Sequence, residues 1–168
     1  MALCAALWIF YSRWGAGKRR LCRRILAALL VCDELFKYGI ALHSGQFRPS
    51  FLPLHLCSIN IFLIAADVIR PNQRLREVLY AVCLPGAFFA LLFPGWNYLP
   101  LWNALCIHSF TAHLLLLLYP LLLIAGGFRP DIRRFAGTLP AALAVVGLVY
   151  CFNRVFGTNF MFLSRAGE

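Results

Sequence analysis

The sequence predicts an all-α fold, a polytopic bundle of about six transmembrane helices forming one domain over residues 1–168. Of the 168 residues, 62% are hydrophobic and only 13% are charged. Soluble domains are about half apolar and roughly one quarter charged, so this composition indicates an integral membrane protein. The apolar residues also fall into separate runs, and short basic or proline-rich and glycine-rich connections divide them.

Most of the apolar runs are long enough to cross a membrane. Four of them approach the ~20 residues that span a hydrocarbon core of ~30 Å, whereas the first and the fourth are short. We expect helices near residues 2–14, 21–42, 51–69, 78–93, 101–125 and 135–156. The first run is not a signal peptide, because its basic residues follow the apolar segment. Pro85, Pro120 and Pro140 lie inside expected helices and predict kinks.

The basic residues predict an orientation. The net formal charge is +10, and most Lys and Arg residues lie in the connections after the first, third and fifth runs. Short cytoplasmic loops collect Lys and Arg, so these connections face the cytoplasm and the alternate ones face outward. We therefore expect a multi-pass protein of the plasma membrane with membrane lipids as partners. Clusters of charge between apolar runs exclude nucleic acid as a partner.

The second run carries three charged residues that a membrane helix must accommodate. Asp33 and Lys37 are four residues apart and share a helix face, so we expect them to pair, with Glu34 pointing elsewhere. One interpretation is a structural ion pair or a lysine that reaches the interface. The other is that Glu34 faces the bundle interior and binds a substrate, because charges inside membranes often mark functional sites.

The beginning of the third run is unusually polar for a membrane segment. Leu-Pro-Leu-His-Leu-Cys occupies residues 52–57, and Asn60 follows. In a helix His55 and Cys57 point to different faces, whereas Asn60 shares the face of Cys57. If the helix begins near residue 51, Cys57 lies roughly 8 Å below its outer end.

The fifth run carries two histidines, His108 and His113, at roughly 11 Å and roughly 18 Å from its outer end. They are five residues apart, so at most one meets Cys57. Each could also form an ordinary hydrogen bond between helices. No Cys and His spacing typical of a metal site occurs, and no glycine loop typical of phosphate binding, so we expect neither a metal nor a soluble cofactor.

The C-terminal part returns the chain to the outer side after residue 156. Asn153 lies near the end of the sixth run and Asn159 follows it. The topology therefore brings Cys57, His108 and Asn159 toward one face of the membrane, with His113 deeper. This convergence predicts a site in the outer half of the bundle.

Three stretches resemble the YwaF-like family of bacterial integral membrane proteins. They are Leu-Pro-Leu-His-Leu-Cys at 52–57, Gly-Phe-Arg-Pro at 127–130 after a histidine-bearing helix, and Asn-x-x-x-Gly-Thr-Asn-Phe-Met-Phe-Leu at 153–163. That family is similar to a vertebrate transmembrane acyltransferase family that remodels ether phospholipids. The resemblance implies Cys57 as nucleophile and His113 as base, because the spacing to residues 127–130 matches His113 better than His108. It also implies that a final family helix is missing.

The residues leave three functions open. The first is a lipid acyltransferase or acyl hydrolase, in which His108 is the alternative base and Asn60, Asn153 or Asn159 donates to the oxyanion. The second is a transporter or channel for a small polar solute, with Glu34, His55 and His108 lining the route. The third is a non-catalytic membrane scaffold whose polar residues hold helices together.

Overall fold

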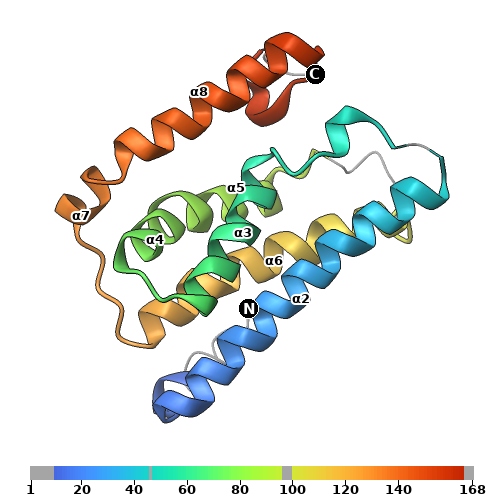
Figure 1. Ribbon diagram of the computed structural model, residues 1–168. Helices are drawn as coiled ribbons and strands as arrows, with labels where there is room; N and C mark the ends of the chain where they lie inside the picture. The colour runs from blue at the N-terminus through green and yellow to red at the C-terminus, as the bar shows by residue number, and fades with distance from the viewer. Residues whose placement is uncertain (1–9, 46, 96–99, 165–168) are drawn as a thin grey trace.

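The computed structural model describes residues 10–45, 47–95 and 100–164. In these ranges the chain forms α-helices joined by short 3₁₀ and π segments, and no β-strand occurs among them (Figure 1). The predicted all-α class is therefore confirmed. The expected first helix at 2–14 lies largely outside the described residues, although residues 10–13 are helical.

Two long helices, α2 (Ala16–His43) and α6 (Ala104–Ala125), run side by side through the molecule (Figure 1). Leu26 and Leu30 of α2 and Leu116 and Leu122 of α6 are buried in one hydrophobic core. With 28 residues, α2 is about 42 Å long at ~1.5 Å per residue. Helix α6 agrees with the expected range to within three residues, whereas α2 begins five residues before the expected residue 21.

Helix α3 (Leu56–Ile69) packs against α2 and α6, but it begins five residues later than residue 51. A short 3₁₀ helix, η1 (Pro49–Phe51), comes first, and His55 precedes α3 in extended backbone with φ −69° and ψ 149°. Proline disfavours the helical conformation in the residue before it, so Pro53 separates η1 from α3. The expected depth of Cys57 below its helix end was therefore wrong, because Cys57 lies in the first turn.

The next helical stretch consists of α4 (Gln73–Val78), η2 (Leu79–Cys83) and α5 (Leu84–Leu92). It begins five residues earlier than expected because Asn72 caps α4, its side chain accepting a hydrogen bond from Arg74 N at 2.8 Å. The middle segment η2 is π-helical and ends at Cys83, two residues before Pro85. Proline lacks an N–H and clashes with the preceding turn, and a π segment relieves this conflict.

Buried ionic contacts join α3 and α4 to α6 and to α7 (Ile132–Ala136) at the end of α3 away from Cys57. The fully buried carboxylate of Asp67 lies 3.0 Å from Arg76 Nε and accepts a hydrogen bond from the Tyr119 hydroxyl at 2.9 Å. Glu77 is also buried, and its carboxylate lies 3.2 Å from Arg134 Nε of α7. These partners offset the large cost of burying each carboxylate.

The last long helix, α8 (Leu139–Phe156), lies along the edge of the bundle (Figure 1). Only Val149 and Asn153 of α8 are buried. After α8 the chain folds back into a short 3₁₀ segment, η3 (Phe160–Phe162), whose Phe160 is 1% exposed. The Phe160 ring meets the His55 ring edge-on, with centroids 4.8 Å apart, and thereby connects α8 to the start of α3.

Three helical stretches of the described residues are long and apolar enough to cross a membrane: Gln73–Leu92, Ala104–Ala125 and Leu139–Phe156. Helix α3 is apolar but has only 14 residues. Helix α2 is longer than any of them and contains Asp33, Glu34 and Lys37. Many leucine, valine and phenylalanine side chains on the outside are exposed, as expected for a surface that faces lipid.

Candidate functional site

A pocket of about 270 Å³ lies among α3, α5, α6 and η3. His55, Cys57 and Asn60 line it from the start of α3, and His113 lines it from α6. The remaining lining residues are Leu56, Cys83, Gly86, Ala87, Ala90, Leu116, Met161 and Phe162. The polar side chains at the start of α3 thus share one mainly apolar pocket with a histidine of α6.

Cys57 is the second residue of α3 and is half-buried. The N–H groups of a first helical turn have no partner within the helix and favour negative charge nearby. Apolar surroundings oppose that charge, so a reactive thiolate at this position needs a base close by. The pocket provides a candidate base in His113, which the family resemblance implies as the partner of Cys57.

The imidazole of His113 is oriented by its own helix. Its Nδ1 lies 2.7 Å from the carbonyl oxygen of Ser109, one turn earlier in α6. A carbonyl oxygen can only accept, so Nδ1 carries the proton and Nε2 is the acceptor nitrogen of the neutral ring. In this tautomer Nε2, and not Nδ1, is the nitrogen that can act as a general base.

Asn60 lies one turn after Cys57, and both line the pocket, as the helical spacing predicts. The Asn60 side chain is 3% exposed, and its Oδ1 has no hydrogen-bond partner within the described part of the chain. His55, also a predicted substrate-binding residue, lines the same pocket, although helical spacing placed it on a different face from Cys57. It precedes the helix, so the alternation of faces that separates i and i+2 in a helix does not apply to it.

His108 lies elsewhere, at the contact between α2 and α6. Its Nδ1 is 2.9 Å from Asp33 Oδ2, and the Thr111 hydroxyl donates to Asp33 Oδ1 at 3.2 Å. His108 is not among the residues that line the pocket. Asp33 therefore connects two helices, and the expected pair of Asp33 with Lys37 was wrong.

Glu34 is the actual partner of Lys37. The two charged groups are in direct contact, and the Tyr38 hydroxyl donates to Glu34 Oε1 at 3.1 Å. Residues three apart on a helix are neighbours just as residues four apart are, so the sequence alone cannot choose between the two carboxylates. Glu34 is 5% exposed and lies outside the pocket lining.

Asn153 holds the segment after α8 in position. Its Nδ2 donates to Phe160 O, and its Oδ1 accepts from Phe160 N and from the Thr158 hydroxyl, each at 2.9 Å. Asn159 Oδ1 accepts from Ser164 N at 3.1 Å. Neither asparagine is among the pocket-lining residues. The structure thus gives Asn153 a positioning role in place of the expected contact with a substrate.

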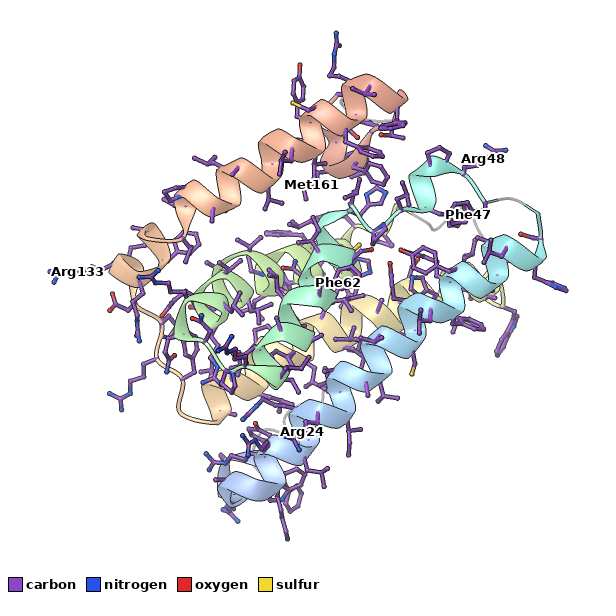
Figure 2. All side chains as sticks on the ribbon, viewed as in Figure 1. Arg24, Phe47, Arg48, Phe62, Arg133 and Met161 are labelled. Atoms are coloured by element: carbon purple, nitrogen blue, oxygen red, sulfur yellow. The ribbon has the colours of Figure 1, made fainter. Side chains whose placement is uncertain are left out.

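What Asn153 positions is a wall of the pocket. Met161 and Phe162 both line it, and their φ angles of 55° and 54° lie in the left-handed region. Figure 2 shows Met161 beneath α8, on the side that faces the rest of the bundle. Sequence reasoning recognised this segment only as a motif and missed both side chains, because a left-handed turn has no hydrophobic periodicity to reveal its direction.

Among the described residues, no group of three or more His, Cys, Asp or Glu side chains could hold a metal ion. The polar groups of the candidate site are the thiol of Cys57, the imidazoles of His55 and His113, and the amide of Asn60.

The model of the TMEM164 family matches residues 1–167. The chain belongs to the TMEM164 family. Neither the curated proteins nor the solved structures include a match to the chain. Membership of the TMEM164 family agrees with the three apolar helices described above, and the chain is a membrane protein. The resemblance to the YwaF-like family and to the acyltransferases stays a prediction from the three sequence motifs.

Within this member of the TMEM164 family, the structure separates the predicted residues into two groups. His55, Cys57, Asn60 and His113 share the pocket. Glu34, His108, Asn153 and Asn159 have partners elsewhere in the chain.

Proposed function

We propose that this protein transfers or hydrolyses lipid acyl groups within the membrane, with Cys57 as nucleophile and His113 as general base. The observation that carries the proposal is that both side chains line one pocket, most of whose other walls are apolar. A thiol beside a base is a recurrent arrangement for acyl transfer through a covalent intermediate. An apolar pocket among lipid-exposed helices suits an ester that arrives from the bilayer.

In the proposed reaction His113 Nε2 takes the thiol proton while the Cys57 sulfur bonds to the carbonyl carbon of an ester. The ester C–O bond then breaks, and the leaving alcohol receives the proton from His113. In the second half, a lysolipid hydroxyl or water gives its proton to His113 and attacks the thioester. The acyl group leaves on the acceptor, and the proton returns to the thiolate sulfur.

Asn60 is the best-placed candidate for stabilising the charge that develops on the carbonyl oxygen. It is buried one helical turn from Cys57 and lines the same pocket. A side-chain amide donates through Nδ2, and removing one such donor typically lowers the rate of acyl transfer about 10²-fold to 10³-fold. The location in this proposal is the plasma membrane, with several spans and with the pocket in the outer half of the bilayer.

The test is whether a lipid-directed acyl probe forms a thioester with Cys57. Intact mass spectrometry of the full chain in lipid nanodiscs would detect the acyl adduct. We expect no adduct with Cys57→Ser and adduct formation slowed by about 10²-fold or more with His113→Ala. His108→Ala is the control, because His108 faces Asp33 and not the pocket. If the probe labels Cys57→Ser to the same extent as the original chain, Cys57 is not the nucleophile.

The transporter alternative has less support from these contacts. It requires Glu34, His55 and His108 along one route, whereas only His55 of the three lines the pocket. Flux of a small polar solute into proteoliposomes above the flux into empty vesicles would support the transporter alternative. The scaffold alternative predicts that Cys57→Ala and His113→Ala lower the melting temperature, and unchanged melting in detergent would count against it.

A further inference from the structure

A glycine inside α5 has neither a conformational nor a packing reason to be glycine. The backbone of Gly86 is helical, and its φ is not positive. A methyl group added at Gly86 would meet Leu56 Cδ2 at 3.8 Å, which is ordinary van der Waals contact. Glycine weakens a helix relative to alanine, so another requirement must favour an absent side chain at this position.

The space beside Gly86 belongs to the pocket that contains Cys57. Gly86, Ala87 and Ala90 all line this pocket, and we call them the α5 wall. The bulky neighbours Phe88 and Phe89 are about half exposed, on the lipid-facing side of the helix. The smallest side chains of α5 are thus the ones directed to the pocket.

A second and independent observation indicates that the pocket takes a ligand. Asn60 is 97% buried, the complement of its 3% exposure, and its Oδ1 has no partner among the described residues. Buried polar atoms in native proteins nearly always have a hydrogen-bond partner. An unpartnered amide oxygen in a residue that lines the pocket therefore indicates a ligand with a hydrogen-bond donor, such as the hydroxyl of a lysolipid acceptor.

The size and chemistry of the pocket indicate which part of a lipid fits. An apolar cavity of about 150 Å³ accommodates benzene, so about 270 Å³ accommodates a short chain segment and not a whole lipid. The walls beyond the α5 wall include Leu56, Leu116 and Phe162, which favour hydrocarbon over a charged head group.

We infer that the α5 wall binds a segment of the acyl chain beyond its first four carbons, and that the missing side chain at Gly86 determines how much of that chain is accepted. This inference rests on the proposed acyl transfer to Cys57. It predicts that filling the space slows acylation of Cys57 by long chains more than acylation by short esters.

The experiment compares p-nitrophenyl butyrate with p-nitrophenyl palmitate as acyl donors to the full chain in nanodiscs. Mass spectrometry measures the rates of butyryl and palmitoyl adduct formation on Cys57. We expect Gly86→Leu to lower the palmitoyl-to-butyryl ratio about tenfold, the change that corresponds to roughly two methylenes losing apolar contact. Gly86→Ala should lower the ratio less and fold at least as well. The matched control is Gly147→Leu, because Gly147 lies in α8 with no atom within 4 Å of an added methyl.

The outcomes separate this inference from the proposed function. An unchanged ratio in folded Gly86→Leu and Gly86→Ala overturns the inference. If neither ester acylates Cys57 in the original chain, the proposed function fails. The α5 wall is then tested by photo-crosslinking a diazirine-bearing palmitate, which should decrease with Gly86→Leu and not with Gly147→Leu. Equal crosslinking of the two variants would also overturn the inference.

Discussion

Asn153→Ala tests whether Asn153 holds η3, which forms one wall of the pocket, in its position. The substitution removes three hydrogen bonds, two to Phe160 and one to Thr158. At about 1 kcal/mol each, their loss costs about 3 kcal/mol, provided that the freed backbone groups reach other partners. Met161 and Phe162 have left-handed backbones, which cost of order 1 kcal/mol or more each. Both contributions favour opening of residues 157–164.

Hydrogen exchange of the full chain in nanodiscs measures this opening. A loss of about 3 kcal/mol corresponds to exchange of the Phe160 amide roughly a hundredfold faster. Thr158→Val is the graded control, because it removes only the hydroxyl bond to Asn153 and should accelerate exchange about fivefold. Exchange in the rest of the bundle should change little, since α8 buries only two residues. Unchanged protection of the Phe160 amide from exchange in Asn153→Ala would refute the proposal that Asn153 holds η3 in position.

The other predictions concern helix contacts. Tyr119→Phe removes a hydrogen bond from the buried carboxylate of Asp67 and should lower the free energy of unfolding by about 1–3 kcal/mol, measured by thermal melting. His108→Ala removes the contact between α2 and α6 at Asp33 and should lower the free energy of unfolding by about 1 kcal/mol without loss of Cys57 acylation. Lost acylation in a folded variant would make His108 the base. Gly157→Ala should cost about 1 kcal/mol, because its φ is 64°.

The fold class was predictable because it depends on composition and on the length of apolar runs. The ends of helices depend on local chemistry that hydropathy does not register. The apolar run at 51–69 contains Pro53, and the helix begins only after it, at Leu56. Residues 73–77 are polar except for Leu75, but the Asn72 cap extends the fourth helix through them. In each case one residue, a proline or an asparagine whose side chain caps the helix, moved a boundary by five residues.

The candidate site was predictable only in part. Cys57, Asn60 and His113 were identifiable because polar side chains are conspicuous in apolar helices. The rotation of one helix against another decides which polar groups meet, and no local pattern encodes it. Asp33 contacts α6 and not Lys37 for this reason. Gly86 escaped notice because an absent side chain becomes informative only when its surroundings are known.

Helix α8 buries only two of its residues and is attached to the bundle mainly near its two ends. Its two ends lead into α7 and into the segment with η3 (Figure 1). In α7 Arg134 contacts Glu77, and in η3 Phe160 contacts His55. With 18 residues α8 is about 27 Å long, close to the thickness of the hydrocarbon core. A bilayer of different thickness changes the tilt of such a helix. A change in tilt displaces the two attachments of α8. One of them, η3, forms a wall of the pocket that Cys57 also lines.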